Sequence, residues 1–128
     1  MKKLILIVLA MLMLSACGQN KEKTQEAVYV NITAEEAKKI MDSQEGYVIL
    51  DTRTQEEFDE GHIPGAILIP YDAITEKAET ILTDKNQLIL VYCRSGRRSK
   101  LAAADLVKLG YTNVKEFGGI IDWPYEVE

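Results

Sequence analysis

The residues best suited to chemistry in this chain lie in one turn that begins at Cys93. An apolar run, 88–92, delivers this cysteine to the end of a predicted strand, and a helical pattern begins at Ser99. Three of the chain's four arginines lie within the turn: Arg94, Arg97 and Arg98. Backbone N–H groups of such a turn can converge on one point, and the new helix adds its positive end. We therefore expect a thiol that loses its proton easily and faces an anion.

Short apolar runs and helical patterns alternate from Val28 onward. The strand candidates are residues 28–31, 47–50, 66–69, 88–92 and 113–117. Helices are predicted to open at Thr33 and Thr54, where Glu36 and Glu57 complete capping boxes, and to cover 99–109. Another is predicted where Ile74, Ala78, Ile81 and Leu82 share one apolar face. This alternation predicts an α/β domain with a mainly parallel sheet, whose functional crevice lies at the carboxyl ends of its strands. Cys93 and Asp51 both fall at such ends.

The N-terminus is typical of a targeting segment and is set aside from the fold. Two lysines precede an apolar stretch that is too short to span a bilayer comfortably. The following Leu14-Ser15-Ala16-Cys17 looks like a bacterial lipobox, which implies cleavage before Cys17 and lipidation of that residue. We expect a signal peptide at 1–16, a lipidated cysteine with a flexible tether at 17–27, and an extracytoplasmic location on a bacterial membrane. An ordinary secretory signal with an incidental cysteine is the alternative.

The remaining chain, 28–128, is long enough for one domain. Without the two lysines of the targeting segment, the net charge changes from −5 to −7. An acidic domain argues against a nucleic-acid partner and against a polybasic hold on lipid, so any membrane contact should come from the anchor alone. With Cys17 lipidated, Cys93 has no partner for a disulfide or a cysteine-rich metal site. We expect no metal or other cofactor, and a monomer.

Four motifs, in this order, resemble those of the single-domain rhodaneses, a family with the sulfurtransferase fold. They are Asp51-Thr52-Arg53, then Glu57-Phe58 with Gly61-His62-Ile63-Pro64-Gly65-Ala66, then Cys93-Arg94-Ser95-Gly96 with Arg98-Ser99, and finally Gly118-Gly119 with Trp123. Together they extend over essentially the whole domain. The resemblance implies a rhodanese-like fold, with a mainly parallel five-stranded sheet and helices on both faces.

The resemblance also implies that Cys93 is catalytic and takes up a sulfane sulfur as a persulfide. The donor is then a small anion of the thiosulfate or polysulfide type, and the acceptor a thiol or cyanide. The turn would bind the substrate through its backbone N–H groups and its arginines, with these residues: Arg94, Ser95, Gly96, Arg97, Arg98 and Ser99. Ser99 serves equally well as a hydrogen-bonding residue at the helix start. Asp51 and Arg53 are expected to support the site as an ion pair, and His62 and Trp123 to be structural.

Two other interpretations remain. Phosphatases and arsenate reductases use a Cys-x5-Arg loop, but that arginine would stand at Ser99, and Arg98 comes one position earlier. A loop that is one residue shorter should hold a sulfur rather than a whole phosphate. Alternatively, the domain is a tethered persulfide carrier without turnover, or a redox sensor, although the sensor lacks a resolving cysteine. The sequence does not separate a carrier from an enzyme, and it leaves the physiological donor and acceptor open.

Overall fold

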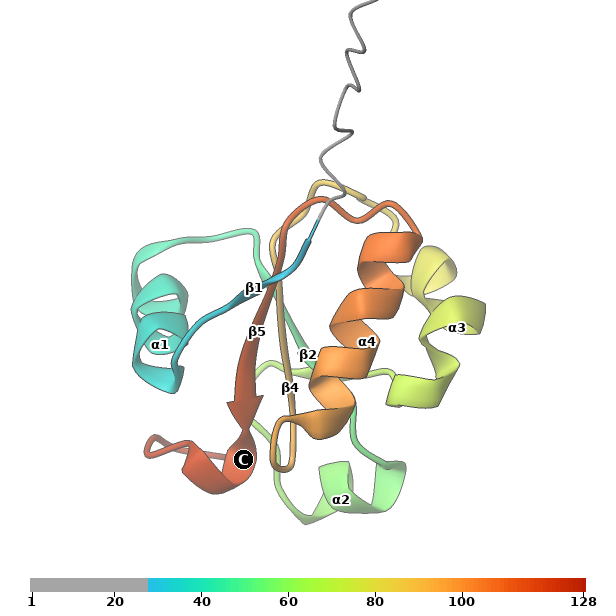
Figure 1. Cartoon of the computed structure of the whole chain (residues 1–128). Helices are drawn as coiled ribbons and strands as arrows, with labels where there is room; N and C mark the ends of the chain where they lie inside the picture. The colour runs from blue at the N-terminus through green and yellow to red at the C-terminus, as the bar shows by residue number, and fades with distance from the viewer. Residues whose placement is uncertain (1–27) are drawn as a thin grey trace, which may run out of the picture.

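The computed structural model describes residues 28–128, in which helices pack against one five-stranded sheet (Figure 1). The strand order is β1-β5-β4-β2-β3, and all neighbouring strands are parallel. The strands are β1 (Val30–Asn31), β2 (Val48–Asp51), β3 (Ile67–Leu68), β4 (Ile89–Cys93) and β5 (Val114–Gly119). The helices are α1 (Ala34–Ser43), α2 (Gln55–Glu60), α3 (Ile74–Ile81) and α4 (Arg97–Lys108), with 3-10 turns at Tyr71–Ala73 and Ile120–Asp122.

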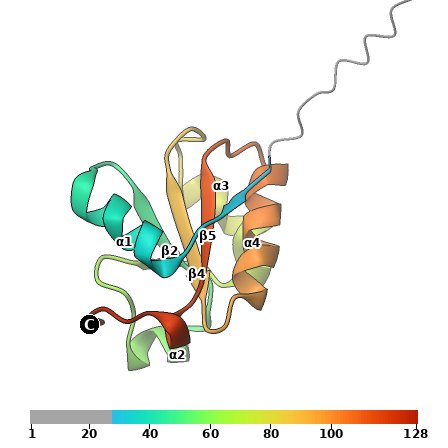
Figure 2. The same cartoon turned by 60° about the vertical axis from the view of Figure 1, so that its left-hand side comes forward.

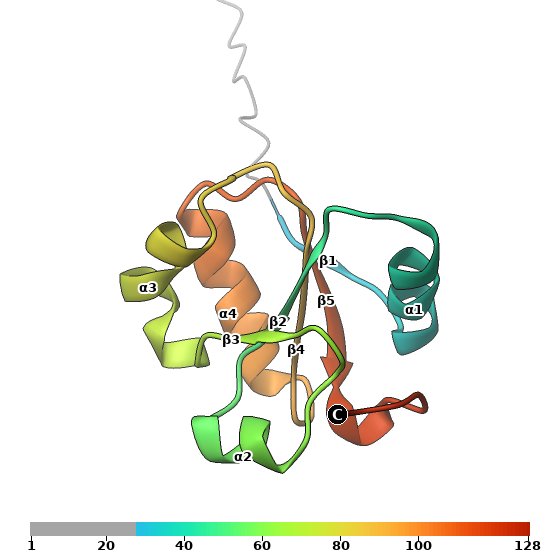
Figure 3. The same cartoon turned by 180° about the vertical axis from the view of Figure 1, so that it is seen from behind.

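Helices cover both faces of the sheet. Figures 2 and 3 show α1 on one side, α3 and α4 on the other, and α2 at the end toward which the strands point. Successive residues of a strand enter opposite cores: Leu90 packs on the α1 side with Trp123, and Val91 packs on the α4 side with Leu106. Burial on both faces explains the continuous apolar runs of the central strands. The expected five-stranded sheet with helices on both faces is confirmed.

Local sequence sets the starts of α1 and α2. The Thr33 hydroxyl accepts the Glu36 N–H at 3.0 Å, and the Glu36 carboxylate accepts the Thr33 N–H at 3.2 Å. The same reciprocal pair joins Thr54 and Glu57 at the start of α2. Both predicted capping boxes are therefore confirmed.

Three predicted details are wrong. Helix α4 begins at Arg97 rather than Ser99, because Gly96 turns the chain in a left-handed conformation with φ of +105°. Both edge strands are shorter than predicted, because each pairs with one neighbour alone: β1 covers Val30–Asn31 rather than 28–31, and β3 covers Ile67–Leu68 rather than 66–69. Ile81 was expected on the apolar face of its helix, but it is 49% exposed at the last position of α3, while Leu82 takes the buried place.

The predicted signal peptide 1–16, the lipidation site Cys17 and the tether 17–27 lie outside the described residues. Within residues 28–128, none of the helices combines the length and the apolar character needed to cross a membrane.

Candidate active site

The carboxyl ends of β2, β4 and β5 lie side by side, so residues far apart in the chain meet there. Asp51 pairs in register with Tyr92, and the next residue, Cys93, pairs with Gly119. Asp51 and Cys93 lie at strand ends, as predicted, although each is the last residue of its strand rather than the first residue after the predicted runs 47–50 and 88–92. The same end of the sheet carries α2 and the first turn of α4 (Figure 1).

The loop that follows β4 lies directly against the glycine pair at the end of β5. A Cβ atom on Gly119 would stand 2.5 Å from Ser95 Cα and still closer to the Arg94 carbonyl group. The Ile121 N–H donates a hydrogen bond to that carbonyl at 3.2 Å. Only glycine at position 119 allows the two backbones to approach this closely, whereas Gly118 is favoured by its positive φ of 91°.

The Cys93 side chain is completely buried at the end of β4. The Gly96 N–H donates a hydrogen bond to Cys93 Sγ over 3.0 Å. Helix α4 starts at the next residue without a side-chain cap, in contrast to α1 and α2. No side chain therefore takes up the free N–H groups of its first turn. The sulfur thus accepts one backbone N–H and lies near the positive end of a helix, which agrees with the expectation from the turn.

The three arginines of the turn have different surroundings. Arg98 donates two hydrogen bonds to the Glu57 carboxylate, at 2.6 and 2.9 Å. This interaction holds the pKa of Glu57 at about 2, and it raises the pKa of Arg98 with a smaller contribution from Cys93. Arg94 and Arg97 are exposed, and their side chains make no hydrogen bond or ion pair within residues 28–128. Arg94 and Arg97 are therefore available to an anionic ligand, whereas Arg98 is already engaged by Glu57.

Asp51 and Arg53 form a buried ion pair, with 2.7 Å between Oδ2 and Nη2. The Tyr92 hydroxyl donates to the same carboxylate at 2.7 Å and accepts the Ile63 N–H at 3.0 Å. Burial, with the hydrogen bond to Asp51, raises the pKa of Tyr92 well above its ordinary range. Arg53 also donates to the Gly61 carbonyl at 2.7 Å. The pair thus braces the loop between α2 and β3, which agrees with a supporting role.

Ser99 is buried in the first turn of α4. Its hydroxyl donates to Glu116 Oε2 at 2.6 Å and lies 3.1 Å from the Gly96 carbonyl oxygen. Of its two predicted roles, the contacts favour hydrogen bonding at the helix start. Glu116 was missed by the sequence analysis, since nothing in the strand pattern around it marks a buried carboxylate.

His62, the chain's one histidine, lies in the loop after α2. Its ring stacks on Phe58 with 3.8 Å between centroids, and its Nδ1 lies 2.9 Å from the Phe58 carbonyl oxygen. Its Nε2 lies 3.3 Å from a carboxylate oxygen of Glu128. These contacts support the predicted structural role and leave no imidazole to act as a base at Cys93.

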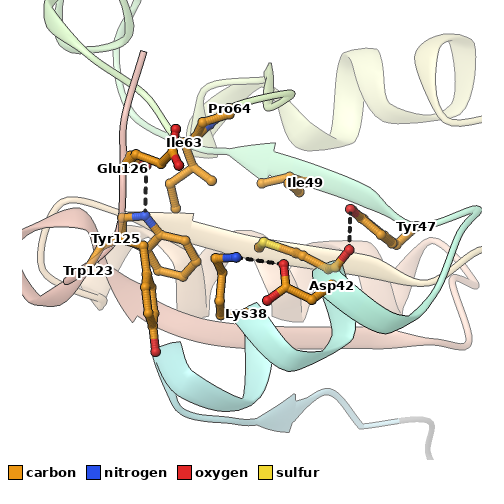
Figure 4. A pocket seen from close by; sticks show the side chains of 10 residues that line it. Lys38, Asp42, Tyr47, Ile49, Ile63, Pro64, Trp123, Tyr125 and Glu126 are labelled. Carbon is orange, nitrogen blue, oxygen red and sulfur yellow. Dashed lines mark hydrogen bonds and ion pairs between the residues drawn. The ribbon is translucent and has the colours of Figure 1, made fainter.

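A separate cavity of about 290 Å³ lies between α1, the loop before β3 and the C-terminal segment (Figure 4). Polar groups at its edge bond to one another: Lys38 pairs with Asp42 at 2.6 Å, and the Trp123 ring N–H donates to the Glu126 carbonyl. Cys93 does not line it, so the candidate site remains at the strand ends. Among the described residues, no cluster of His, Cys, Asp or Glu is arranged to hold a metal ion.

Comparison with known proteins gives related sequences and folds. The thiosulfate sulfurtransferase PspE of Escherichia coli is 40% identical over 73 residues, which cover 57% of this chain and 70% of PspE. YrkF of Bacillus subtilis, whose name proposes a sulfur carrier, is 37% identical over 98 residues. That match covers 76% of this chain and 52% of YrkF, so the chain spans about half of that relative. A solved structure described as rhodanese with anions from E. coli matches with a TM-score of 0.60 and 35% identity, over 64% of this chain and 96% of that one.

The family model described as the rhodanese-like domain matches residues 33–124. This interval contains every helix of the sheet domain and the whole turn from Cys93 to Ser99. The named relatives support sulfur transfer, in general terms, as the activity of such a chain. On the family match and the shared fold, this chain belongs to the rhodanese family.

Proposed function

We propose that this chain is a sulfurtransferase that carries a sulfane sulfur as a persulfide on Cys93. The observation that carries the proposal is the 3.0 Å hydrogen bond from the Gly96 N–H to Cys93 Sγ. This donor, with the uncapped start of α4, would stabilise first a thiolate and then a persulfide anion. Arg98, held in place by two hydrogen bonds to Glu57, adds a fixed positive charge to the turn that follows Cys93.

The proposed reaction has two displacements at sulfur. In the first, the Cys93 thiolate attacks the outer sulfur of thiosulfate, a sulfur–sulfur bond forms, and sulfite leaves with the electron pair of the bond that breaks. In the second, cyanide or a thiolate attacks the outer sulfur of the persulfide, and Cys93 leaves as a thiolate. Both leaving groups depart as anions, so neither step needs a general base at the moment of transfer. This agrees with a site that has no imidazole.

The burial of Cys93 favours a small sulfur donor. No surface of this residue is exposed, whereas Arg94, Ser95 and Arg97 are exposed around it. A terminal sulfur on a small anion fits between the loop amides more readily than a bulky organic persulfide does. The two free guanidinium groups would attract such an anion to an otherwise acidic protein. Thiosulfate and inorganic polysulfide are therefore the donors we propose.

Phosphatase or arsenate reductase chemistry is less well supported. Such enzymes clamp a tetrahedral oxyanion bidentately, through two N–H groups of one arginine. Arg98 is the arginine nearest to that position, and both of its terminal nitrogens already donate to Glu57. Ser99, where the Cys-x5-Arg spacing requires the arginine, is buried against Glu116.

A persulfide carrier without rapid turnover is the second candidate, and the match to YrkF favours it. A carrier would bind the sulfur with the same loop after β4 but would release it to a protein partner rather than to cyanide. A redox sensor is weaker, because Cys93 is the one cysteine of residues 28–128 and no resolving thiol lies beside it.

We also propose that the protein works outside the cytoplasm, anchored by lipid at Cys17. The lipobox-like Leu14-Ser15-Ala16-Cys17 supports this location. The described chain begins next to β1, at the end of the sheet opposite to Cys93 (Figure 1). Labelling with a radioactive fatty acid, compared between the native chain and Cys17→Ser, tests the anchor.

The test of the proposed function is intact mass spectrometry of residues 18–128 after brief treatment with thiosulfate, with Cys93→Ser alongside. We expect the native protein alone to gain one sulfur, about 32 Da, and to lose it to cyanide or dithiothreitol. No adduct with thiosulfate or polysulfide, on a thiol that still alkylates, would refute sulfur transfer at Cys93. An adduct that forms once but turns over poorly with cyanide would favour the carrier.

A further inference from the structure

Glu116 is a charged residue whose side chain is buried inside the domain. It is 2% exposed on β5, next to the first turn of α4. Within residues 28–128, no Lys, Arg or His nitrogen lies within 4 Å of its carboxylate. Burying a carboxylate without a cation is costly unless strong hydrogen bonds compensate for the lost water. The role of Glu116 should therefore follow from the two hydrogen bonds that its carboxylate accepts.

Both hydrogen bonds end on the same oxygen, Glu116 Oε2. The Ser99 hydroxyl donates to it at 2.6 Å, and the Gly118 N–H donates to it at 2.8 Å. Ser99 belongs to the first turn of α4, and Gly118 belongs to the end of β5. One carboxylate oxygen thus joins the two segments between which the loop after β4 is held.

These two segments are the walls of the sulfur site. A Cβ atom on Gly96 would lie 3.5 Å from Gly118 Cα, so the loop and the end of β5 are already in contact. Gly96 has contacts on both sides: its N–H donates to Cys93 Sγ, and its carbonyl oxygen lies 3.1 Å from the Ser99 hydroxyl oxygen, whose proton goes to Glu116 at the shorter distance of 2.6 Å. A shift of Ser99 or Gly118 would therefore change the aim of the donor that reaches the sulfur.

We propose that Glu116 is a positioning residue for sulfur transfer, an inference that rests on the function proposed for Cys93. Its carboxylate ties Ser99 to Gly118 and so keeps the loop amides aimed at Cys93 Sγ. It also accepts the hydrogen bond from the Ser99 hydroxyl. Because this hydroxyl has a single proton, it does not donate to the outer sulfur of a persulfide on Cys93. The hydrogen-bond donors to a persulfide are then backbone N–H groups of the loop, and Ser99 holds that loop in position without contacting the persulfide.

The shared oxygen makes the proposal testable with two substitutions of Glu116. In Glu116→Gln, the amide oxygen can take the place of Oε2 and keep both hydrogen bonds, so only the charge is lost. Glu116→Ala loses both bonds. The matched control is Glu45→Ala, which removes an exposed carboxylate in the loop before β2. The rate of persulfide formation is measured in a single turnover by the full chain at saturating thiosulfate, with folding checked by circular dichroism.

We expect Glu116→Ala to slow this rate about tenfold, and Glu116→Gln to restore it to within about threefold of native. The thiosulfate concentration for half the maximal rate should change less than about twofold, because Arg94 and Arg97 remain. Ser99→Ala should slow the reaction as much as Glu116→Ala, and the double variant should be no slower than either. A purely structural Glu116 would change the melting temperature and leave these rates unchanged.

A native rate in folded Glu116→Ala, or two losses that multiply in the double variant, would overturn the proposal. If Glu116→Ala does not fold, Ser99→Ala provides the test, since a native rate of persulfide formation in that variant would also overturn the proposal. Failure of the native chain to form any persulfide would instead refute the proposed function. In that case the rate of Cys93 alkylation by iodoacetamide still compares the loop in the native chain and in Glu116→Gln, Glu116→Ala and Ser99→Ala.

Discussion

Gly119→Ala should damage the sulfur site through one added methyl group. The new Cβ would stand 2.5 Å from Ser95 Cα, and the Arg94 carbonyl group lies nearer still. Ordinary contact of such atoms begins at about 3.4 Å, so the loop after β4 has to move by about 1 Å. All of the opposing atoms belong to the backbone, so no side-chain rotation can relieve the contact.

The size of the effect follows from the same geometry. Gly119 has an extended backbone with φ of −129°, so alanine adds no conformational strain of its own. Overpacking by one methyl group typically costs about 1–3 kcal/mol, and a rigid contact lies at the upper end. A displacement of about 1 Å at a reacting group can slow a reaction on the order of 100-fold. We therefore expect a loss of about 3 kcal/mol in unfolding free energy and about 100-fold in the rate of persulfide formation.

The neighbouring glycine provides the matched control. Gly118 has φ of +91°, where alanine costs about 1–2 kcal/mol, but an added Cβ there meets no atom within 4 Å. Gly118→Ala should therefore lose stability but slow persulfide formation much less than Gly119→Ala does, because no atom of the loop has to make room for the new Cβ. Urea unfolding gives the first quantity, and single-turnover mass spectrometry on thiosulfate gives the second. A Gly119→Ala variant with native stability and a rate within about twofold of native would refute the close approach of the two backbones.

Other predictions concern the groups around the loop. Because Arg98 lowers the pKa of Glu57 to about 2, its contribution is complete above about pH 5 and is lost as the pH falls toward 2. Lowering the pH from about 5 to about 2 should thus reduce the unfolding free energy of the native domain by about 1–2 kcal/mol more than it reduces that of the Glu57→Gln variant. Urea unfolding of both proteins at each pH measures this difference. Tyr92→Phe should cost about 2 kcal/mol by removing a buried donor to Asp51, and a loss below about 0.5 kcal/mol would contradict this. Arg97→Ala should raise the half-saturating thiosulfate concentration several-fold in dilute salt and less at about 1 M, and equal effects at both would exclude an electrostatic role.

Local signals in the sequence predicted the framework well. Thr33 and Thr54 each have a glutamate three residues later, and both pairs form the reciprocal hydrogen bonds that start a helix. Apolar runs predicted β2 and β4, because both faces of these two strands are buried. A strand end followed by a glycine turn sufficed to bring Cys93 next to backbone donors.

Contacts between distant segments were not predictable in the same way. Glu57 was recognised as a capping residue, but its ion pair with Arg98 spans 41 positions. Ser99 resembled the first residue of a helix by type, yet the left-handed Gly96 starts α4 two residues earlier and turns the Ser99 hydroxyl inward. Its partner Glu116 looked like an ordinary polar residue of a strand. Pairing of this kind depends on how α4 lies on the sheet, which no local pattern contains.

The two carboxylates that flank the start of α4 explain how an acidic protein could keep the anion site that we propose. Glu57 and Glu116 would repel a persulfide or a sulfur donor if they faced it with free oxygens. Instead, Glu57 is engaged by Arg98, and Glu116 Oε2 accepts the Ser99 hydroxyl and a backbone N–H. Each carboxylate thereby holds one side of the same helical turn, and its charge is offset by the donors that it fixes. Rigid donors stabilise a developing anion better than mobile ones, because they need no reorganisation during the reaction. On this view, negative residues next to the loop help an anionic reaction by immobilising its donors.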